Sequence, residues 1–274
     1  MRSWPTASAV VSTFADYFGL ALLTPSLPFY LAEIGMADSD IPFWNGVITT
    51  TQFAAIIFGN IIWGRVSDRH GSVCALQVAM AGDTVFFALS AAAPFGLRGA
   101  PGGIMLAAIR FGAGLFTPLV SAILFIFDRV DSPKAVVRGM GLYAMGIITA
   151  YSMGGVVVGL LYTSLGWAGI SGLSAGGSAI AFLYVTFLSS PPLTSERPKP
   201  KGLWRALRTA DFLTHATTAL VVGYQMNCSI FMCVIILKEE FRWGPQAVRE
   251  PHLTTPHLTS PCLTLPHLTL PHLA

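Results

Sequence analysis

Charged residues are scarce in this chain and make up only 11% of its 274 residues. A soluble globular domain carries about 25% charged residues, so an ordinary soluble fold is not expected. The excess of basic residues is also small, because 16 Lys and Arg stand against 13 Asp and Glu for a net charge of +3. Nucleic acid is therefore not an expected partner.

The sequence also lacks the patterns that support enzyme chemistry or metal binding. It contains no glycine-rich phosphate loop, no nucleophile elbow and no paired carboxylates in a water-accessible catalytic setting. The four cysteines have no paired spacing suited to zinc or to a disulfide framework. They are Cys74, Cys228, Cys233 and Cys262. We expect neither covalent chemistry nor a bound metal or cofactor.

Apolar sequence is abundant instead, at 53% hydrophobic residues. A helix needs roughly 20 predominantly apolar residues to cross the hydrocarbon core of a bilayer. Seven stretches meet this requirement: 10–31, 46–63, 74–94, 103–127, 141–165, 169–189 and 212–237. They predict an all-α integral membrane protein in contact with the lipid bilayer. The first stretch is too long for a secretory signal and contains Asp16, which disfavours that alternative.

Basic residues alternate between the loops and so predict the orientation, because Lys and Arg collect on the cytosolic side. One set of loops holds Arg2, Arg65, Arg69, Arg129, Lys134, Arg138, Arg197, Lys199, Lys201, Arg205 and Arg208, and the other set holds Arg98 alone. We expect a multi-pass protein with a cytosolic N-terminus.

Composition divides the chain into four parts. Residues 1–189 hold six spans, and residues 190–211 begin with SPPLTSERPKPKG, which is typical of a cytosolic linker. Residues 212–248 hold a seventh span. Residues 249–274 form a low-complexity tail with a five-residue repeat beginning PHLTT, which a repeated CCTCA unit would encode. We expect this tail to be disordered or to follow loss of the true reading frame near Val248; a His-rich metal tract is the alternative.

The first span carries an ionisable group and two prolines. A charge inside a membrane helix costs about 2.5–3.5 kcal/mol and usually faces a partner or a water-filled path. Asp16 is therefore a functional candidate, unless it lies close enough to the cytosolic interface to reach water. Pro25 and Pro28 weaken the backbone hydrogen bonding of the same helix and favour a bend.

The loop after the second span reads GRVSDRHGS. Gly64 and Gly71 permit tight turning, and Asp68 lies between Arg65 and Arg69 at the membrane face. Short cytosolic loops are often rich in Arg, so the Arg residues alone are not informative here. The order G-x-x-x-D-R-x-G is the informative feature of this loop.

With these two segments, the chain over 14–248 resembles the major facilitator superfamily, and within it the drug:proton antiporter branch that includes tetracycline efflux carriers. Asp16, Gly19, Pro25 and Pro28 fit the branch pattern D-x-x-G followed by P-x-x-P. The loop fits the superfamily motif at Gly64, Asp68, Arg69 and Gly71. The resemblance implies a helical bundle whose N-terminal six-helix half is followed by one more span, which is truncated relative to the family's twelve.

The fourth span places Arg110 four residues before Gly114, as in a family motif. A buried Arg needs an acceptor, for which Asp83 of the third span or a backbone carbonyl is a candidate. The resemblance implies that such an Arg tunes proton release from a carboxylate. The alternative is that Arg110 extends to the outer headgroups.

Two further groups complete the candidate residues. Small residues of the fifth span form a predicted packing groove at Gly146, Gly154, Gly155 and Gly159. Polar residues of the seventh span are candidate substrate contacts at Tyr224, Gln225 and Asn227, or hydrogen-bond within the bundle instead.

The leading hypothesis is a carrier that moves a small organic solute by alternating access, coupled to protons. Asp16 would carry the proton, with Asp83 and Arg110 as its electrostatic environment, and Asp68 would meet Arg138 in a cytosolic gate. The alternative is a truncated, non-transporting membrane protein or fragment of such a carrier, because the second half stops after one helix. A channel or receptor has less support.

Overall fold

The computed structural model describes residues 6–93, 96–130 and 132–188, and every regular element in these ranges is an α-helix. Five helices in this part of the chain are long and apolar enough to cross a membrane. The all-α membrane prediction is therefore confirmed. The predicted linker, seventh span and repeat tail lie outside the described residues.

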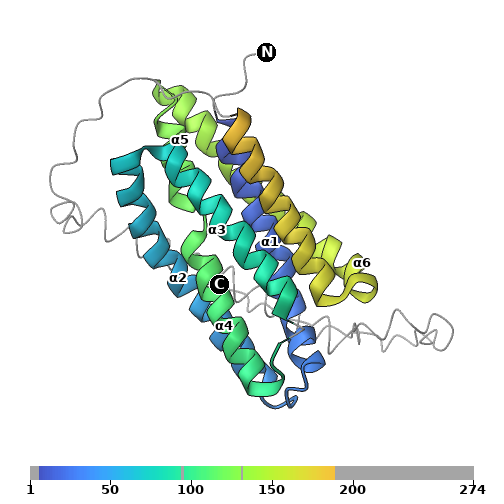
Figure 1. The fold of residues 1–274 in the computed structure, drawn as a ribbon. Helices are drawn as coiled ribbons and strands as arrows, with labels where there is room; N and C mark the ends of the chain where they lie inside the picture. The colour runs from blue at the N-terminus through green and yellow to red at the C-terminus, as the bar shows by residue number, and fades with distance from the viewer. Residues whose placement is uncertain (1–5, 94–95, 131, 189–274) are drawn as a thin grey trace, which may run out of the picture.

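Helix α1 spans Ala7–Glu33 and is the most buried of these helices. It packs mainly against α6 (Pro133–Leu188), as Figure 1 shows. Pro25 and Pro28 both lie inside α1, which continues past them. Each proline removes one backbone donor, a loss that a membrane helix tolerates when its neighbours cover the freed carbonyls.

Helices α2 (Ile41–His70) and α3 (Ser72–Ala92) are joined by a one-residue turn. Gly71 makes this turn with φ at +87°, a conformation that favours glycine. Gly64 lies inside α2, so our expectation that it helps to form the turn is wrong. The apolar segment of α2 simply continues as helix through the charged motif to His70.

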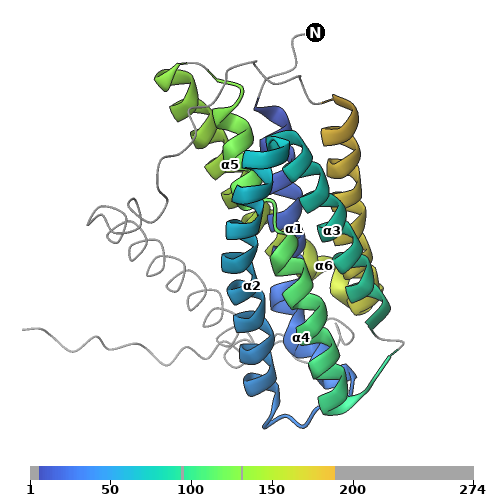
Figure 2. The same cartoon turned by 60° about the vertical axis from the view of Figure 1, so that its left-hand side comes forward.

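The predicted fourth span is interrupted, which the apolar pattern alone did not indicate. Helix α4 (Gly99–Phe116) ends before Thr117 and Pro118, and α5 (Leu119–Phe127) follows them. Pro118 has no backbone N–H to donate to the Gly114 carbonyl, which accepts the N–H of Thr117 over 3.4 Å instead. The neighbouring Leu115 carbonyl accepts a 2.6 Å hydrogen bond from Nε1 of Trp63. Figure 2 shows α2 running alongside α4, where this contact is made.

Helix α6 contains two membrane segments rather than one. Its 56 residues would extend about 84 Å at about 1.5 Å per residue, far more than the bilayer core of about 30 Å. Gly166 interrupts it with φ at 60° and ψ at −171°, and the chain folds back there. The break falls between the predicted spans 141–165 and 169–189, so the described residues contain six apolar membrane segments.

The turns that carry basic residues lie at one end of the bundle. Val73 and Val130 pack with Ala9 in one cluster, which places the turns at Gly71 and Asp128 near the start of α1. We call this the Ala7 end. Gly99 donates a backbone hydrogen bond to Ile34, so the loop carrying Arg98 lies at the opposite end, the Glu33 end.

Candidate functional site

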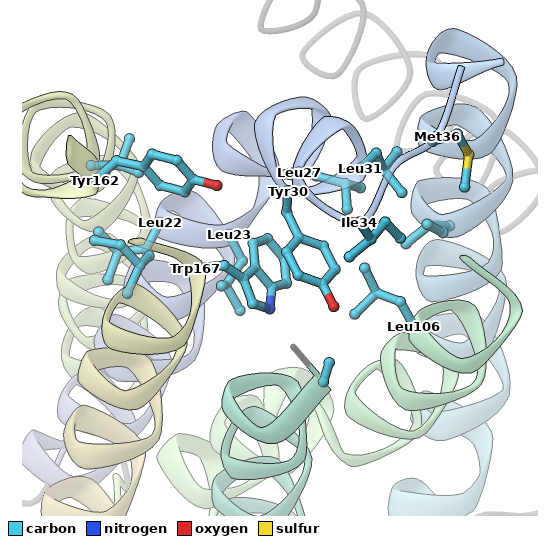
Figure 3. Close-up of a cluster of buried hydrophobic side chains, with 14 of the residues drawn as sticks. Leu22, Leu23, Leu27, Tyr30, Leu31, Ile34, Met36, Leu106, Tyr162 and Trp167 are labelled. Atoms are coloured by element: carbon cyan, nitrogen blue, oxygen red, sulfur yellow. The ribbon is translucent and has the colours of Figure 1, made fainter. Parts of the chain in front are cut away.

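The two large hydrophobic clusters of the bundle leave a polar layer between them. The cluster nearer the Glu33 end includes Leu22, Phe87, Leu106, Trp167 and Ile170, and Figure 3 shows part of it. In that cluster Tyr30 stacks on Trp167 with ring centroids 4.4 Å apart. The cluster nearer the Ala7 end includes Ala15, Met80, Ala122 and Ala181.

Four polar side chains lie in this layer, each from a different membrane segment: Asp16, Asp83, Arg110 and Ser178. In sequence, Asp83 falls between Met80 of one cluster and Phe87 of the other, and Ser178 falls between Ile170 and Ala181. None of the four is more than 4% exposed. The site is thus enclosed by apolar side chains on both sides along the bundle.

The carboxyl groups of Asp16 and Asp83 lie within hydrogen-bonding reach of each other. Two carboxylates in such a low-dielectric setting repel strongly, so they favour sharing one proton. The alternative that Asp16 reaches the cytosolic interface does not apply, because its side chain is enclosed in the bundle.

Ser178 supplies the shortest side-chain hydrogen bond of this group. Its hydroxyl donates to Oδ2 of Asp83 over 2.6 Å, joining residues 95 positions apart. This distance is typical of a hydroxyl bonded to an ionised carboxylate. Oδ1 of Asp83 is buried without a hydrogen-bond partner among the described residues.

Arg110 faces the same carboxyl pair from α4. Its charge interacts with that of Asp83. Nε and Nη1 of Arg110 are buried and form no hydrogen bond with a described residue. With 1% exposure, the side chain does not extend to the outer surface, which rules out the headgroup alternative. The guanidinium therefore lies inside the bundle as a nearby, indirect counter-charge.

Three tyrosines lie near Asp16. Tyr17 follows Asp16 directly in α1, and Tyr143 and Tyr151 of α6 lie close enough to interact electrostatically with its carboxyl group. Tyr17 and Tyr151 meet edge to face, with ring centroids 5.5 Å apart. Asp16 thus has both aromatic neighbours and a second carboxyl group nearby.

Close helix contacts hold these segments together. A Cβ atom on Gly19 would lie 2.7 Å from the Phe87 ring, and one on Gly154 would lie 2.5 Å from Cβ of Ala21. Gly146 faces Val10 with more room, and Gly114 packs on the backbone of Gln52. The predicted packing role thus has a structural counterpart at these glycines.

Gly155 and Gly159 differ from Gly154. A Cβ on Gly155 would meet no atom within 4 Å, so α1 does not use this position for close packing. Gly159 is partly buried. The side of α6 that carries Gly155 is therefore open within the described residues.

The motif at the end of α2 is exposed. Asp68 and Arg69 lie in the last turn of α2 at the Ala7 end, and Arg138 is exposed near the start of α6. The gate contact between Asp68 and Arg138 stays a prediction. The candidate substrate contacts Tyr224, Gln225 and Asn227 lie outside the described residues.

Two buried polar residues were not among the predicted site residues. One is Ser178, although Ser171, Ser174 and Ser178 recur at helical spacing and form a buried polar face. Arg129 counted only as a loop charge, yet it is 5% exposed and its guanidinium lies 3.6 Å from the centre of the Phe125 ring. Burial lowers the pKa of Arg129 to about 10, which leaves it charged at neutral pH.

Comparison with known proteins agrees with this architecture. The family model of the Major Facilitator Superfamily matches residues 9–263. The chain is 25% identical over 196 residues to the multidrug resistance protein MdtG of Proteus mirabilis (strain HI4320), a match that covers 70% of this chain and 47% of the relative. No solved structure matches the chain.

A second curated relative is the staphyloferrin B transporter of Staphylococcus aureus (strain NCTC 8325 / PS 47). It is 23% identical over 234 residues, which are 81% of this chain and 52% of the relative. The chain spans about half the length of each of these relatives.

Proposed function

Because the chain belongs to the Major Facilitator Superfamily, we propose that it moves a small organic solute across a membrane by alternating access, coupled to protons. The observation that carries this proposal is the enclosed pair of carboxyl groups at Asp16 and Asp83, with Arg110 beside it. No other described side chain in the polar layer between the two clusters is as costly to bury, and costly ionisable groups inside a membrane usually serve a function such as coupling.

A change in proton occupancy at this pair would alter the stability of the packed bundle. With one shared proton, the carboxyl pair carries a single negative charge, which Arg110 balances. Loss of that proton leaves a second, uncompensated negative charge among apolar side chains, which is strongly unfavourable. The enclosed arrangement is then disfavoured relative to one in which water reaches Asp16.

This difference is what coupling requires, since a ligand shifts an equilibrium only when it binds the two states with different affinity. The proton would favour the enclosed state, and its release would favour the open one. Arg110, whose Nε and Nη1 form no hydrogen bond with a described residue, can rearrange toward the carboxyl pair when the proton leaves. In this way the Arg would assist proton release.

The two relatives support a small organic solute as the cargo. One is named for multidrug resistance and the other for staphyloferrin B. The seventh span would contribute Tyr224, Gln225 and Asn227 to the solute site, and Asp68 with Arg138 would close the pathway on the cytosolic side. Membership of the family and these relatives also favour a transporter over an enzyme.

Reconstitution of the full chain in liposomes tests the proposal. Tetracycline or staphyloferrin B is added outside vesicles that contain a pH-sensitive dye. We expect one of these solutes to cause proton movement that protein-free vesicles do not show, together with accumulation of the solute when a pH gradient is imposed. Solute movement that ignores the pH gradient would contradict proton coupling.

A further inference from the structure

Ser178 differs from the other buried serines of its helix face in the bond that its hydroxyl makes. Ser174, one turn earlier, donates a 3.1 Å hydrogen bond to the carbonyl of Ile170 in its own helix. That intrahelical bond is the usual choice for a serine in an apolar helix. The Ser178 hydroxyl instead donates to Oδ2 of Asp83 on α3.

This difference distinguishes the two carboxyl groups of the pair. Asp83 receives the hydroxyl of Ser178 and faces the charge of Arg110, and both interactions favour its ionised form. A serine hydroxyl has one hydrogen to donate, and Ser178 donates it to Asp83. Oδ2 of Asp83 is therefore the acceptor in this bond.

Among the described residues, no hydroxyl donates a comparable hydrogen bond to Asp16. The groups that face it are the carboxyl of Asp83 from α3, the hydroxyl-bearing rings of Tyr143 and Tyr151 from α6, and Tyr17 on its own helix. No cationic group among the described residues is directed at Asp16 alone. Its neutral form can donate a hydrogen bond to Asp83, whereas its ionised form would only add repulsion.

We propose that Ser178 is a positioning residue that fixes the negative charge of the carboxyl pair on Asp83 and leaves the exchangeable proton on Asp16. In the enclosed state the Asp16 O–H donates to the Asp83 carboxylate. On release the O–H bond breaks, the proton passes to water, and the electron pair remains on Asp16. This inference rests on the proposed coupling function and specifies which carboxyl group acts in it.

The test uses infrared spectroscopy of the full chain in lipid membranes, which detects the C=O stretch of a protonated carboxyl group. Two backgrounds isolate the members of the pair. Asp16→Asn leaves Asp83 as the carboxyl that titrates there, and Asp83→Asn leaves Asp16. The Asp16→Asn/Asp83→Asn double variant supplies the spectrum to be subtracted.

Into each background we introduce Ser178→Ala, with Ser174→Ala as the matched control one turn away. In the Asp16→Asn background, Ser178→Ala should shift the pH midpoint of the carboxyl band upward by about one pH unit, because a hydrogen bond to a charged group is lost. In the Asp83→Asn background the same substitution should leave the midpoint unchanged. Ser174→Ala should be without effect in both.

Ser178→Cys replaces the hydroxyl with a somewhat larger thiol that donates only weakly, so it should shift the Asp83 midpoint in the same direction without leaving a cavity. An equal shift in both backgrounds, or a matching shift from Ser174→Ala, would overturn the role of Ser178. So would a carboxyl band at neutral pH that Asp83→Asn removes and Asp16→Asn keeps. None of these readouts depends on solute movement, so failure here is distinguishable from failure of proton-coupled transport.

Discussion

Trp63 of α2 donates a 2.6 Å hydrogen bond from Nε1 to the carbonyl of Leu115, immediately before α4 breaks. The indole thereby satisfies a carbonyl in a region where Thr117 and Pro118 interrupt the helical pattern. Gly59 of α2 lets the two helices approach, since a Cβ there would lie 2.5 Å from the same oxygen. The break in the fourth span is therefore stabilised by α2.

Replacing this donor tests the relationship. Trp63→Phe keeps most of the apolar contact with Phe116 but leaves the Leu115 carbonyl without its indole partner. We expect a loss of about 1–3 kcal/mol in stability, the usual cost of an unsatisfied buried group. Thermal unfolding of the detergent-solubilised protein measures it. Trp44→Phe is the control, because the Trp44 indole donates no hydrogen bond to a described residue; equal effects of the two would contradict this role.

Two adjacent glycines of α6 give a matched pair. Gly154→Ala would bring a methyl group onto Ala21 of α1, and we expect it to cost about 1–3 kcal/mol. Gly155→Ala meets open space, so it should be neutral or stabilise the helix by up to about 1 kcal/mol. Thermal unfolding of both variants decides the matter. Similar destabilisation by both substitutions would show that α1 and α6 do not pack as described.

A double-mutant cycle tests the charge interaction between Arg110 and Asp83. Arg110→Gln leaves the ionised pair without its counter-charge, and we expect a loss of about 3–5 kcal/mol. Adding Asp83→Asn removes the charge that Arg110 balanced, so the double variant should recover much of this loss. If the free-energy changes of the two single variants simply add in the double variant, the two residues do not interact.

The sequence predicted the membrane segments because their cause is local. A run of about 20 apolar residues is stable in lipid only as a helix, whatever its neighbours are. Pro118 itself indicates the break, since proline interrupts backbone hydrogen bonding. The mean hydropathy of the span does not reveal it, because one proline changes that mean very little. Gly64 shows the opposite error, because a glycine near a charged turn was assigned to the turn although the helix continues.

The site was predicted only in part, because the local sequence pattern does not determine which side chains of different helices meet. Asp16, Asp83 and Arg110 were recognisable as costly charges in apolar spans. That Asp83 meets Asp16 and Ser178, rather than forming a hydrogen bond with Arg110, depends on the relative rotation of four segments. A serine in a helix has no signal of its own that distinguishes an intrahelical bond, as at Ser174, from a contact with another helix.

Orientation can be tested by labelling single cysteines. With the native cysteines replaced, His70→Cys and Arg138→Cys should react with a membrane-impermeant reagent from the cytosolic side, because both lie at the Ala7 end. Arg98→Cys should react from the opposite side. Labelling of His70→Cys and Arg138→Cys from different sides would contradict both the topology and the proposed cytosolic N-terminus.

The central claim is that Asp16 carries the coupling proton, and the pH dependence of solute uptake by Asp16→Asn tests it most directly. Uptake of tetracycline or staphyloferrin B into liposomes is measured across a pH series, with and without an imposed pH gradient. Because asparagine cannot release a proton, we expect the variant to lose gradient-driven accumulation and to show uptake that no longer changes with pH. Full pH-dependent, gradient-driven uptake by Asp16→Asn would contradict the account.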